Sequence, residues 1–347
     1  MIKLAVVGTG GMAHHHAEKF KEIKGVKLVA ACDIIKGRAA AFAEKFGIPQ
    51  AFTDFDELLA KVDIDAVTVV TVDSAHAPVS LKAIAKGKHV LCEKPLATCF
   101  DEAKTMAEAA QKSGVINMIN FSYRNSAAIQ KAHQLVQKGV LGRIMHIEAS
   151  YLQSWLCSKI WGDWRTNQSM LWRLSTQHGS GGVLGDIGVH ILDFATFAAG
   201  DVASLNCRLR TFHKADGDRI GEYPLDANDS AVISVEMKEG ALGTIHTSRW
   251  ATGQGNSLRL RVYGEEGALV VDLDQSWDTL QICRGKDLDK AAWQTLACPK
   301  TLSNFQRFIK SIRSGENDQP DFARGAQVQK MLDACFESDK TGSRVLL

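Results

Sequence analysis

A segment in the middle of the chain, residues 181–193, places three polar side chains at helical spacing. Asp186 and His190 are four residues apart, and Asp193 follows His190 by three. On a helix all three lie along one face, and that face needs a polar site to point at because the intervening residues are apolar. Histidine titrates near neutral pH, so His190 is a candidate general base. Asp186 could orient this base or bind a neighbouring hydroxyl.

Two other interpretations of this segment stay open. Aspartate and histidine at this spacing can chelate a metal ion, but no third strong ligand is evident nearby, so we expect no metal. His190 could also be a core histidine whose ring is satisfied by its neighbours.

A lysine that could act on the same substrate follows a short strand. Lys94 lies in the tripeptide Glu93-Lys94-Pro95, directly after an apolar run that ends at Cys92. In an open parallel sheet, ligands bind beyond the carboxyl ends of the strands. Lys94 could therefore hydrogen-bond a reacting oxygen and stabilise alkoxide charge. The alternative is a solvated loop lysine, as most lysines are.

A nucleotide-binding pattern opens the chain. Residues 2–7 form a short apolar run, after which Gly8, Gly10 and Ala13 match G-x-G-x-x-A. A second apolar run ends at Asp33, 33 − 13 = 20 residues after Ala13, where a dinucleotide-binding unit places its ribose-binding acid. Gly8 allows a tight turn, Gly10 lets a pyrophosphate approach the backbone, and the helix start offers free N–H groups to phosphates.

The acid at the end of the second strand predicts which cofactor binds. Asp33 can accept hydrogen bonds from both adenosine ribose hydroxyls, whereas a 2′-phosphate would meet its negative charge. Lys36 and Arg38 are near enough in sequence to restore some NADP binding. We therefore expect NAD, with NADP weaker. Such a cofactor carries the hydride chemistry, and the protein must position the carbinol and take the hydroxyl proton.

Tryptophan is concentrated in one stretch of the chain. Four of the seven tryptophans lie between residues 155 and 172, and two of them directly precede an arginine, in Trp164-Arg165 and Trp172-Arg173. Aromatic faces could stack on a sugar ring while the arginines bind hydroxyls. A subunit interface is equally consistent, because Trp and Arg are enriched there too.

The apolar pattern changes along the chain. Up to about residue 122, apolar strands such as 66–71 alternate with amphipathic helices, which predicts a doubly wound parallel sheet. From residue 143 onward, alternation in 233–237 and 258–262 predicts antiparallel hairpins with one apolar face.

The fold class predicted from these patterns is α/β with two domains. A Rossmann domain is expected over 1–122, and an α+β domain with a large open, mostly antiparallel sheet over 123–347. One helix is expected at about 182–199, and the last helix, about 323–338, could pack back on the N-terminal domain.

The composition of the chain indicates which classes of partner to expect. The 347 residues carry a formal net charge of +2 and no basic block, so nucleic acid is not an expected partner. No apolar run is long enough to span a membrane. None of the eight cysteines forms a C-x-x-C pair, which predicts reduced thiols in a cytoplasmic protein. An open sheet is often covered by a partner, so we expect a homodimer or homotetramer.

Together these motifs resemble the Gfo/Idh/MocA family, named for glucose–fructose oxidoreductase, inositol dehydrogenase and the rhizopine-catabolism oxidoreductases. The resemblance rests on G-x-G-x-x-A, Glu93-Lys94-Pro95 and the G-G-x-L-x-D-x-G-x-H-x-x-D stretch, in order over essentially the whole chain. It implies a two-domain NAD(P)-dependent sugar or polyol oxidoreductase, with Lys94, Asp186 and His190 in the active site. One departure is Val72-Asp73, where the family usually has Pro-Asn near the nicotinamide ribose.

The candidate residues fall into two sets beside the catalytic three. Expected cofactor contacts are Gly8, Gly10, Gly11, Met12, Asp33, Ile34, Arg38, Thr71, Asp73, His76, Glu93 and Lys94. Expected substrate contacts are Tyr123, Arg124, Trp155, Trp164, Arg165, Trp172, Asp186 and His190.

The function predicted is oxidation of a secondary hydroxyl of a sugar, sugar acid or cyclitol with NAD. One alternative is a glycoside-cleaving enzyme of the same fold that oxidises its substrate transiently. The other is a non-catalytic NAD(P)-sensing regulator, which would not need Lys94, Asp186 and His190 together.

Overall fold

The structure is a computed structural model that describes residues 1–347, with the side chain of Ser169 excepted. The chain divides into two compact units, the first made of 1–122 and 302–329, the second of 123–301 and 330–347. Residues 302–329, which sequence patterning groups with the second domain, thus belong with the first. No helix among the described residues combines the length and the apolar character needed to cross a membrane.

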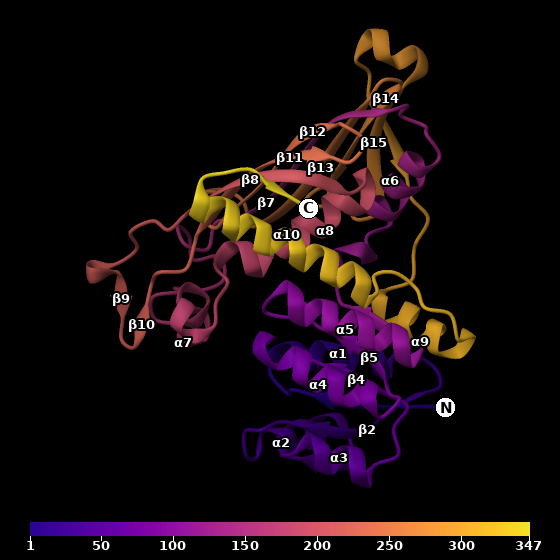
Figure 1. Cartoon of the computed structure of the whole chain (residues 1–347), viewed down its shortest axis with the longest axis vertical. Coiled ribbons are helices and arrows are strands. Elements are labelled where there is room, and N and C mark those ends of the chain that lie inside the picture. Colours follow the sequence, from indigo (N-terminus) through magenta and orange to yellow (C-terminus); the bar gives the residue numbers. More distant parts are fainter. The chain divides into compact units, whose positions relative to one another are not determined.

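The first unit is built on a parallel sheet of six strands in the order β3-β2-β1-β4-β5-β6. Its strands are β1 (Ile2–Val7), β2 (Val26–Cys32), β3 (Gln50–Phe52), β4 (Ala66–Val69), β5 (His89–Cys92) and β6 (Asn117–Ile119). Its helices are α1 (Gly11–Lys21), α2 (Arg38–Phe46), α3 (Phe55–Lys61), α4 (Asp73–Ala85), α5 (Phe100–Ser113) and α9 (Asn304–Ser314). Strands β2, β4 and β5 of this sheet are labelled in Figure 1 among helices α1 to α5. This strand order is that of a doubly wound dinucleotide-binding fold, so the predicted Rossmann domain is confirmed.

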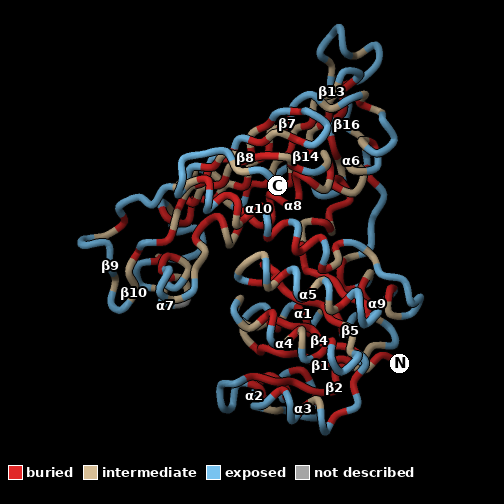
Figure 2. The backbone as a smooth tube through the Cα atoms, in the orientation of Figure 1, coloured by how far each residue is buried: buried red, intermediate tan, exposed pale blue. Residues whose placement is uncertain are grey.

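Burial on both faces explains the continuous apolar strands of this sheet. All four residues of β4 are buried, and Figure 2 shows its neighbours buried in the same way. Helix α9, which the sequence analysis did not predict, adds Phe305 and Phe308 to the core around Phe20. Its start is fixed by a capping box between Ser303 and Gln306.

The second unit contains a sheet of nine strands in the order β16-β15-β14-β13-β7-β12-β11-β8-β17. These strands are β7 (Ile144–Gln153), β8 (Val202–Arg210), β11 (Ser230–Met237), β12 (Leu242–Ser248), β13 (Asn256–Gly264), β14 (Gly267–Asp272), β15 (Thr279–Arg284), β16 (Gln294–Ala297) and β17 (Val345–Leu346). Only the β7–β12 pair is parallel. The predicted mostly antiparallel sheet is therefore confirmed.

Helices cover one face of this sheet. Helix α8 (Val189–Ala199) packs on β7, β12 and β13, and α6 (Ala127–Gln137) packs on β14 and β15. Residues of β11 alternate between buried and exposed, as a sheet with one covered face requires. The last helix, α10 (Phe322–Thr341), begins in the first unit and ends in the second.

Candidate active site

The glycine turn after β1 has the geometry that a dinucleotide cofactor needs. Gly8 has φ 84°, and a Cβ there would lie 2.4 Å from the carbonyl oxygen of Val70, so only glycine fits. At Gly10 and Gly11 a Cβ would meet nothing within 4 Å. Helix α1 begins with no side-chain cap on its N–H groups, and such a helix end attracts phosphate. These residues fit the pyrophosphate of NAD.

Asp33 is held in place at the end of β2. Its Oδ2 accepts hydrogen bonds from the Thr9 N–H and hydroxyl, both at 2.9 Å, and its Oδ1 accepts one from the Ile35 N–H. Burial alone would raise the pKa of the Asp33 carboxyl, but these hydrogen bonds and the nearby Arg38 guanidinium bring it below the usual range. The side chain is thus a fixed anionic acceptor. Ile34, which follows Asp33, and Met12, in the glycine turn, are both exposed, and their cofactor contacts stay predictions.

Glu93 is a buried anchor in this structure. Its Oε1 accepts hydrogen bonds from the Nε2 of His16 at 2.8 Å and from the amide of Asn120 at 2.6 Å. The Nδ1 of His16 is 2.7 Å from the Thr68 hydroxyl. Burial tends to raise the pKa of Glu93, but His16, Asn120 and Lys94 lower it well below its usual range. This network joins α1 and β4 to the residues that directly follow β5 and β6. Glu93 therefore holds these elements together, and its predicted cofactor contact stays a prediction.

His76 connects the loops that follow β4 and β5. Its ring is fully buried, with Nδ1 2.7 Å from the Pro95 carbonyl oxygen and Nε2 3.2 Å from that of Thr71. Burial lowers the pKa of His76, but Cys92, Asp73 and the Pro95 carbonyl raise it to about 9. A protonated ring can donate to both carbonyl oxygens. The predicted cofactor contact by His76 stays a prediction, and its visible task is to hold the Lys94–Pro95 segment.

Lys94 is partly buried in the loop directly after β5. Its N–H donates to Glu93 Oε2 at 3.2 Å. Thr71 and Asp73 lie at the end of β4 and the start of α4, and the Thr71 hydroxyl donates to the Val72 carbonyl oxygen. Because both loops leave the carboxyl edge of the sheet, these residues occupy the edge where ligands bind in this fold.

In the second unit, Asp186 lies in a single π-helical turn, Leu184–Gly188, that precedes α8. The sequence predicts one continuous helix here, so the π turn is a local difference, of a kind often found at functional sites. Asp186 Oδ2 accepts a hydrogen bond from Arg249 Nη2 at 2.9 Å, and Arg173 Nε lies 3.8 Å away. Arg249 is fully buried and also donates to the carbonyl oxygen of Arg173. The carboxylate is therefore held in an ion pair.

His190 lies on α8 against aromatic rings. Its ring centroid is 5.0 Å from that of Tyr123, nearly perpendicular to it, and 6.4 Å from that of Tyr151. His190 is 9% exposed. This packing fixes the plane of the imidazole while leaving part of the side chain accessible, which a general base needs.

Arg124 and Asp193 form a buried ion pair. Two nitrogens of Arg124 donate to the two carboxylate oxygens of Asp193, at 2.8 and 2.6 Å. Both side chains are at most 2% exposed. The substrate contact expected of Arg124 stays a prediction. In the structure, Arg124 anchors α8 at Asp193, three residues after His190.

The tryptophan-rich stretch divides by burial. Trp155 and Trp164 are fully buried in a small core with Leu156, Leu171 and Leu174, which argues against direct stacking of these two rings on a sugar. Trp172 is 38% exposed. In both predicted pairs, Trp164-Arg165 and Trp172-Arg173, the guanidinium lies over the ring of the preceding tryptophan.

The sequence analysis missed several residues that contact His190, Asp186 or the tyrosines around His190. Tyr151 and Gln153 lie on β7, Asn256 starts β13 and Arg249 directly follows β12. None belongs to a motif, and only the alternation of β7 hinted that Tyr151 and Gln153 point to the buried face. No cluster of three or more metal-ligating side chains occurs among the described residues, and the expected absence of a metal stays a prediction.

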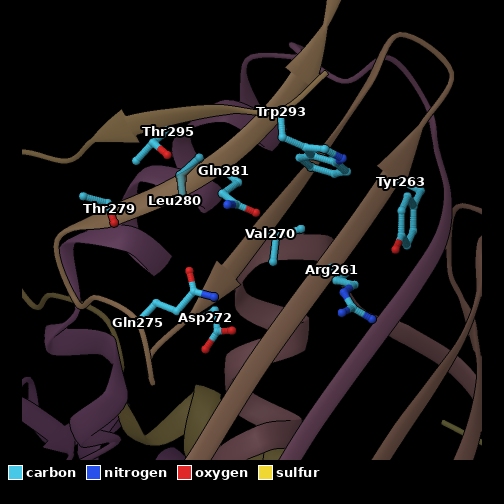
Figure 3. Close-up of a pocket in the computed structure, with 10 residues that line it drawn as sticks. All are labelled: Arg261, Tyr263, Val270, Asp272, Gln275, Thr279, Leu280, Gln281, Trp293 and Thr295. Carbon is cyan, nitrogen blue, oxygen red and sulfur yellow. The ribbon is translucent and has the colours of Figure 1, made fainter. Parts of the chain in front are cut away.

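A separate hollow of about 280 Å³ lies on the sheet face that α6 and α8 do not cover. Figure 3 shows Trp293, Arg261, Asp272 and Gln281 around it, on strands β13–β15 and the segment before β16. It contains none of the predicted site residues.

Comparisons with known proteins match both parts of the chain. Residues 2–121 match a family model described as an oxidoreductase family with an NAD-binding Rossmann fold, and residues 129–270 match the GFO/IDH/MocA C-terminal domain. The chain belongs to the Gfo/Idh/MocA family. The predicted NAD-dependent oxidoreductase and its cofactor are thereby confirmed.

Relatives in the Gfo/Idh/MocA family cover most of the chain. Levoglucosan dehydrogenase of Pseudarthrobacter phenanthrenivorans is 28% identical, with 86% of this chain and 84% of the relative covered. The 1,5-anhydro-D-fructose reductase of Ensifer adhaerens is 30% identical, with 78% and 75% covered. A solved levoglucosan dehydrogenase in complex with NADH and levoglucosan superposes with a TM-score of 0.87 at 25% identity, covering 99% of both chains.

Proposed function

We propose that this protein is an NAD-dependent dehydrogenase that oxidises a secondary hydroxyl of a sugar, sugar acid or cyclitol. The observation that carries the proposal is the site in the second unit. There His190 packs against the Tyr123 ring, and Asp186, on the same helical segment as His190, is ion-paired with Arg249. Its relatives include enzymes named for levoglucosan and for scyllo-inositol. The substrate is therefore expected to be a polyhydroxylated ring.

Each residue has a distinct task in this reaction. The glycine turn after β1 and Asp33 would hold NAD, which would supply the acceptor for the hydride of the carbinol carbon. His190 takes the proton of the reacting hydroxyl, and the plane of its ring is set by Tyr123. Lys94 hydrogen-bonds the same oxygen and stabilises the developing negative charge. Asp186, held by Arg249, accepts a hydrogen bond from a neighbouring hydroxyl and so orients the ring.

The two rivals differ in their products. A glycoside-cleaving relative would release an aglycone without net NADH, and a regulator would give neither product. The buried support around Asp186 and His190 favours a catalytic site over a sensor, because a sensor needs no positioned base.

We also propose that the protein is a cytoplasmic homo-oligomer whose copies meet through the uncovered face of the nine-stranded sheet. All eight cysteines are free thiols, which suits a reducing compartment. On that face Val232 is 55% and Trp293 41% exposed. A copy covering this face would bury both side chains. Light scattering should give at least a dimer mass, and Val232→Glu should lower it; an unchanged monomer mass for both proteins would contradict the proposal.

The function is tested with a panel of sugars and NAD⁺. Levoglucosan, myo-inositol, scyllo-inositol and methyl glucosides should be incubated with the protein while NADH absorbance is followed. We expect NADH formation with at least one member and a ketone product by mass spectrometry. Release of methanol without NADH would favour the glycoside-cleaving enzyme, and no reaction despite NADH binding would favour the regulator.

A further inference from the structure

A chain of side-chain hydrogen bonds connects a buried tryptophan to the rings that hold His190. Trp155 Nε1 donates to Gln153 Oε1 at 3.1 Å. Gln153 Nε2 donates to Asn256 Oδ1 at 2.8 Å, and Asn256 Nδ2 donates to the Tyr123 hydroxyl at 3.0 Å. Asn256 and Gln153 are directly paired residues of β13 and β7.

The direction of every bond in this chain is set at its buried end. An indole N–H only donates, so it must face the oxygen of the Gln153 amide. The Gln153 nitrogen then faces Asn256, which must present its own oxygen in return. Trp155 and Gln153 are at most 5% exposed, so water does not readily compensate for a reversed amide. The amide nitrogen of Asn256 is therefore turned toward Tyr123.

Tyr151 closes the chain into a ring. Its hydroxyl donates to Asn256 Oδ1 at 2.8 Å, and that oxygen already accepts from Gln153. The Tyr151 and Tyr123 hydroxyls are also hydrogen-bonded to each other, so Tyr123 must be the donor in that contact. Burial and the neighbouring Tyr123 raise the pKa of Tyr151, which keeps it a protonated donor. One of the two N–H groups of Asn256 is left for another acceptor.

The exposed Asn256 amide is linked to the proposed base through one residue, Tyr123. Asn256 is exposed, whereas Gln153, Tyr151 and Trp155 are buried. Tyr123, which receives the Asn256 hydrogen bond, is the ring packed at 5.0 Å from His190. Four buried or partly buried side chains thus hold one exposed amide in a single orientation, which a surface asparagine would not need.

We propose that Asn256 is a substrate-specificity residue that donates its remaining N–H to an oxygen of the sugar beside His190. This assignment rests on the proposed dehydrogenase function. The oxygen is that of a hydroxyl or an acetal, because a fixed N–H donor requires an acceptor. A substrate with an ammonium group at that position is rejected. Trp155 and Gln153 act as positioning residues, which gives Trp155 an indirect role in recognition.

The first test replaces the donor by an acceptor of the same shape. Asn256→Asp should lower kcat/KM for the active sugar of the panel by about tenfold to a hundredfold, mainly through KM. Gln111→Glu, which makes the same chemical change on the exposed face of α5, should leave kcat/KM unchanged. NADH binding and thermal unfolding should be normal in both variants.

The second test reverses the Asn256 amide through a substitution at Gln153, a residue that is not assigned a contact with the substrate. In Gln153→Glu, one carboxylate oxygen can still accept from Trp155, but the other requires Asn256 to turn its nitrogen inward. Asn256 then presents oxygen outward, and kcat/KM should fall about as far as in Asn256→Asp. Normal kcat/KM in Gln153→Glu would overturn the argument from hydrogen-bond direction.

Deoxy analogues of the active sugar separate recognition from damage to the fold. With the unmodified protein, kcat/KM for the analogue that lacks the contacted oxygen should be lower than for the parent sugar by about the factor that Asn256→Asp causes. With Asn256→Asp, kcat/KM for this analogue should fall little further. If the losses in kcat/KM caused by Asn256→Asp and by the missing oxygen were additive for every analogue, the assignment of Asn256 would be overturned but the dehydrogenase function would not. Absence of NADH production by the unmodified protein with every sugar would instead contradict the dehydrogenase function, and this assignment with it.

Discussion

The side chains nearest the candidate catalytic residues are set by partners far away in the sequence. Asp186 is paired with Arg249, 63 residues further on, and Glu93 with His16, 77 residues earlier. Local spacing could predict Asp33, Lys94 and His190, because each follows a strand or repeats along one helix face. It could not predict Arg249 or His16, since nothing in the sequence around them shows which strands become neighbours.

At the residue scale, we expect Asp33 to decide the preference between NAD and NADP. The unmodified protein should use NAD at least about tenfold better than NADP in kcat/KM, roughly 1.4 kcal/mol. In Asp33→Ser the ratio should shrink or reverse, because the charge repelling a 2′-phosphate is removed and Arg38, whose guanidinium lies 3.9 Å from Asp33 Oδ2, is released. Steady-state kinetics with both cofactors measure the ratio.

The control for this change is Asp63→Ser. Asp63 pairs with Lys3 and its side chain is 80% exposed, so its loss should leave the ratio as it was. Equal use of NAD and NADP by the unmodified protein would contradict the role given to Asp33, though not the Rossmann fold.

At the scale of elements, apolar periodicity predicted the strands of both sheets better than the helices around the site. The β-branched run that begins at residue 66 pairs in parallel and the alternating strand from residue 233 pairs antiparallel, each as predicted. The π turn at Leu184–Gly188 was not predictable, because it depends on contacts such as that of Asn228 with the Leu184 N–H. Helix α9 was missed although its capping box, Ser303 and Gln306, is visible in the sequence.

The contact between α10 and the segment after Lys94 can be tested through Gly325. Alanine normally stabilises a helix interior by about 1 kcal/mol over glycine. At Gly325, however, a Cβ would lie 2.7 Å from Leu96 Cδ2 and 3.3 Å from Ile119 Cδ1. Gly325→Ala should therefore destabilise the protein by about 1–3 kcal/mol, seen as a lower Tm.

Leu96→Ala is the matched partner for this test, because it removes Leu96 Cδ2, the atom nearest to the added Cβ. The double variant should be less destabilised than the sum of the two single changes. A higher Tm for Gly325→Ala alone would show that α10 does not pack as closely on Leu96 as the structure indicates.

For the whole molecule, the change of pattern near residue 122 predicted two different sheets, and both are present. Which segments of the chain belong to each unit was less predictable. Residues 302–329 return to the first unit, and the signal for this is tertiary: Phe305 packs on Phe20 and His16 at 5.2 and 4.8 Å. Such contacts depend on the completed fold, whereas strand periodicity depends on neighbouring residues.

In the proposed reaction Lys94 stabilises charge and His190 takes the proton, while other residues bind the cofactor. The most direct measurement is kcat of Lys94→Ala and His190→Ala on the active sugar, beside an NADH titration of each variant. Each substitution should lower kcat by at least about 100-fold, with NADH affinity nearly unchanged because the glycine turn and Asp33 are intact. A near-normal kcat in either variant would contradict the role assigned to that residue.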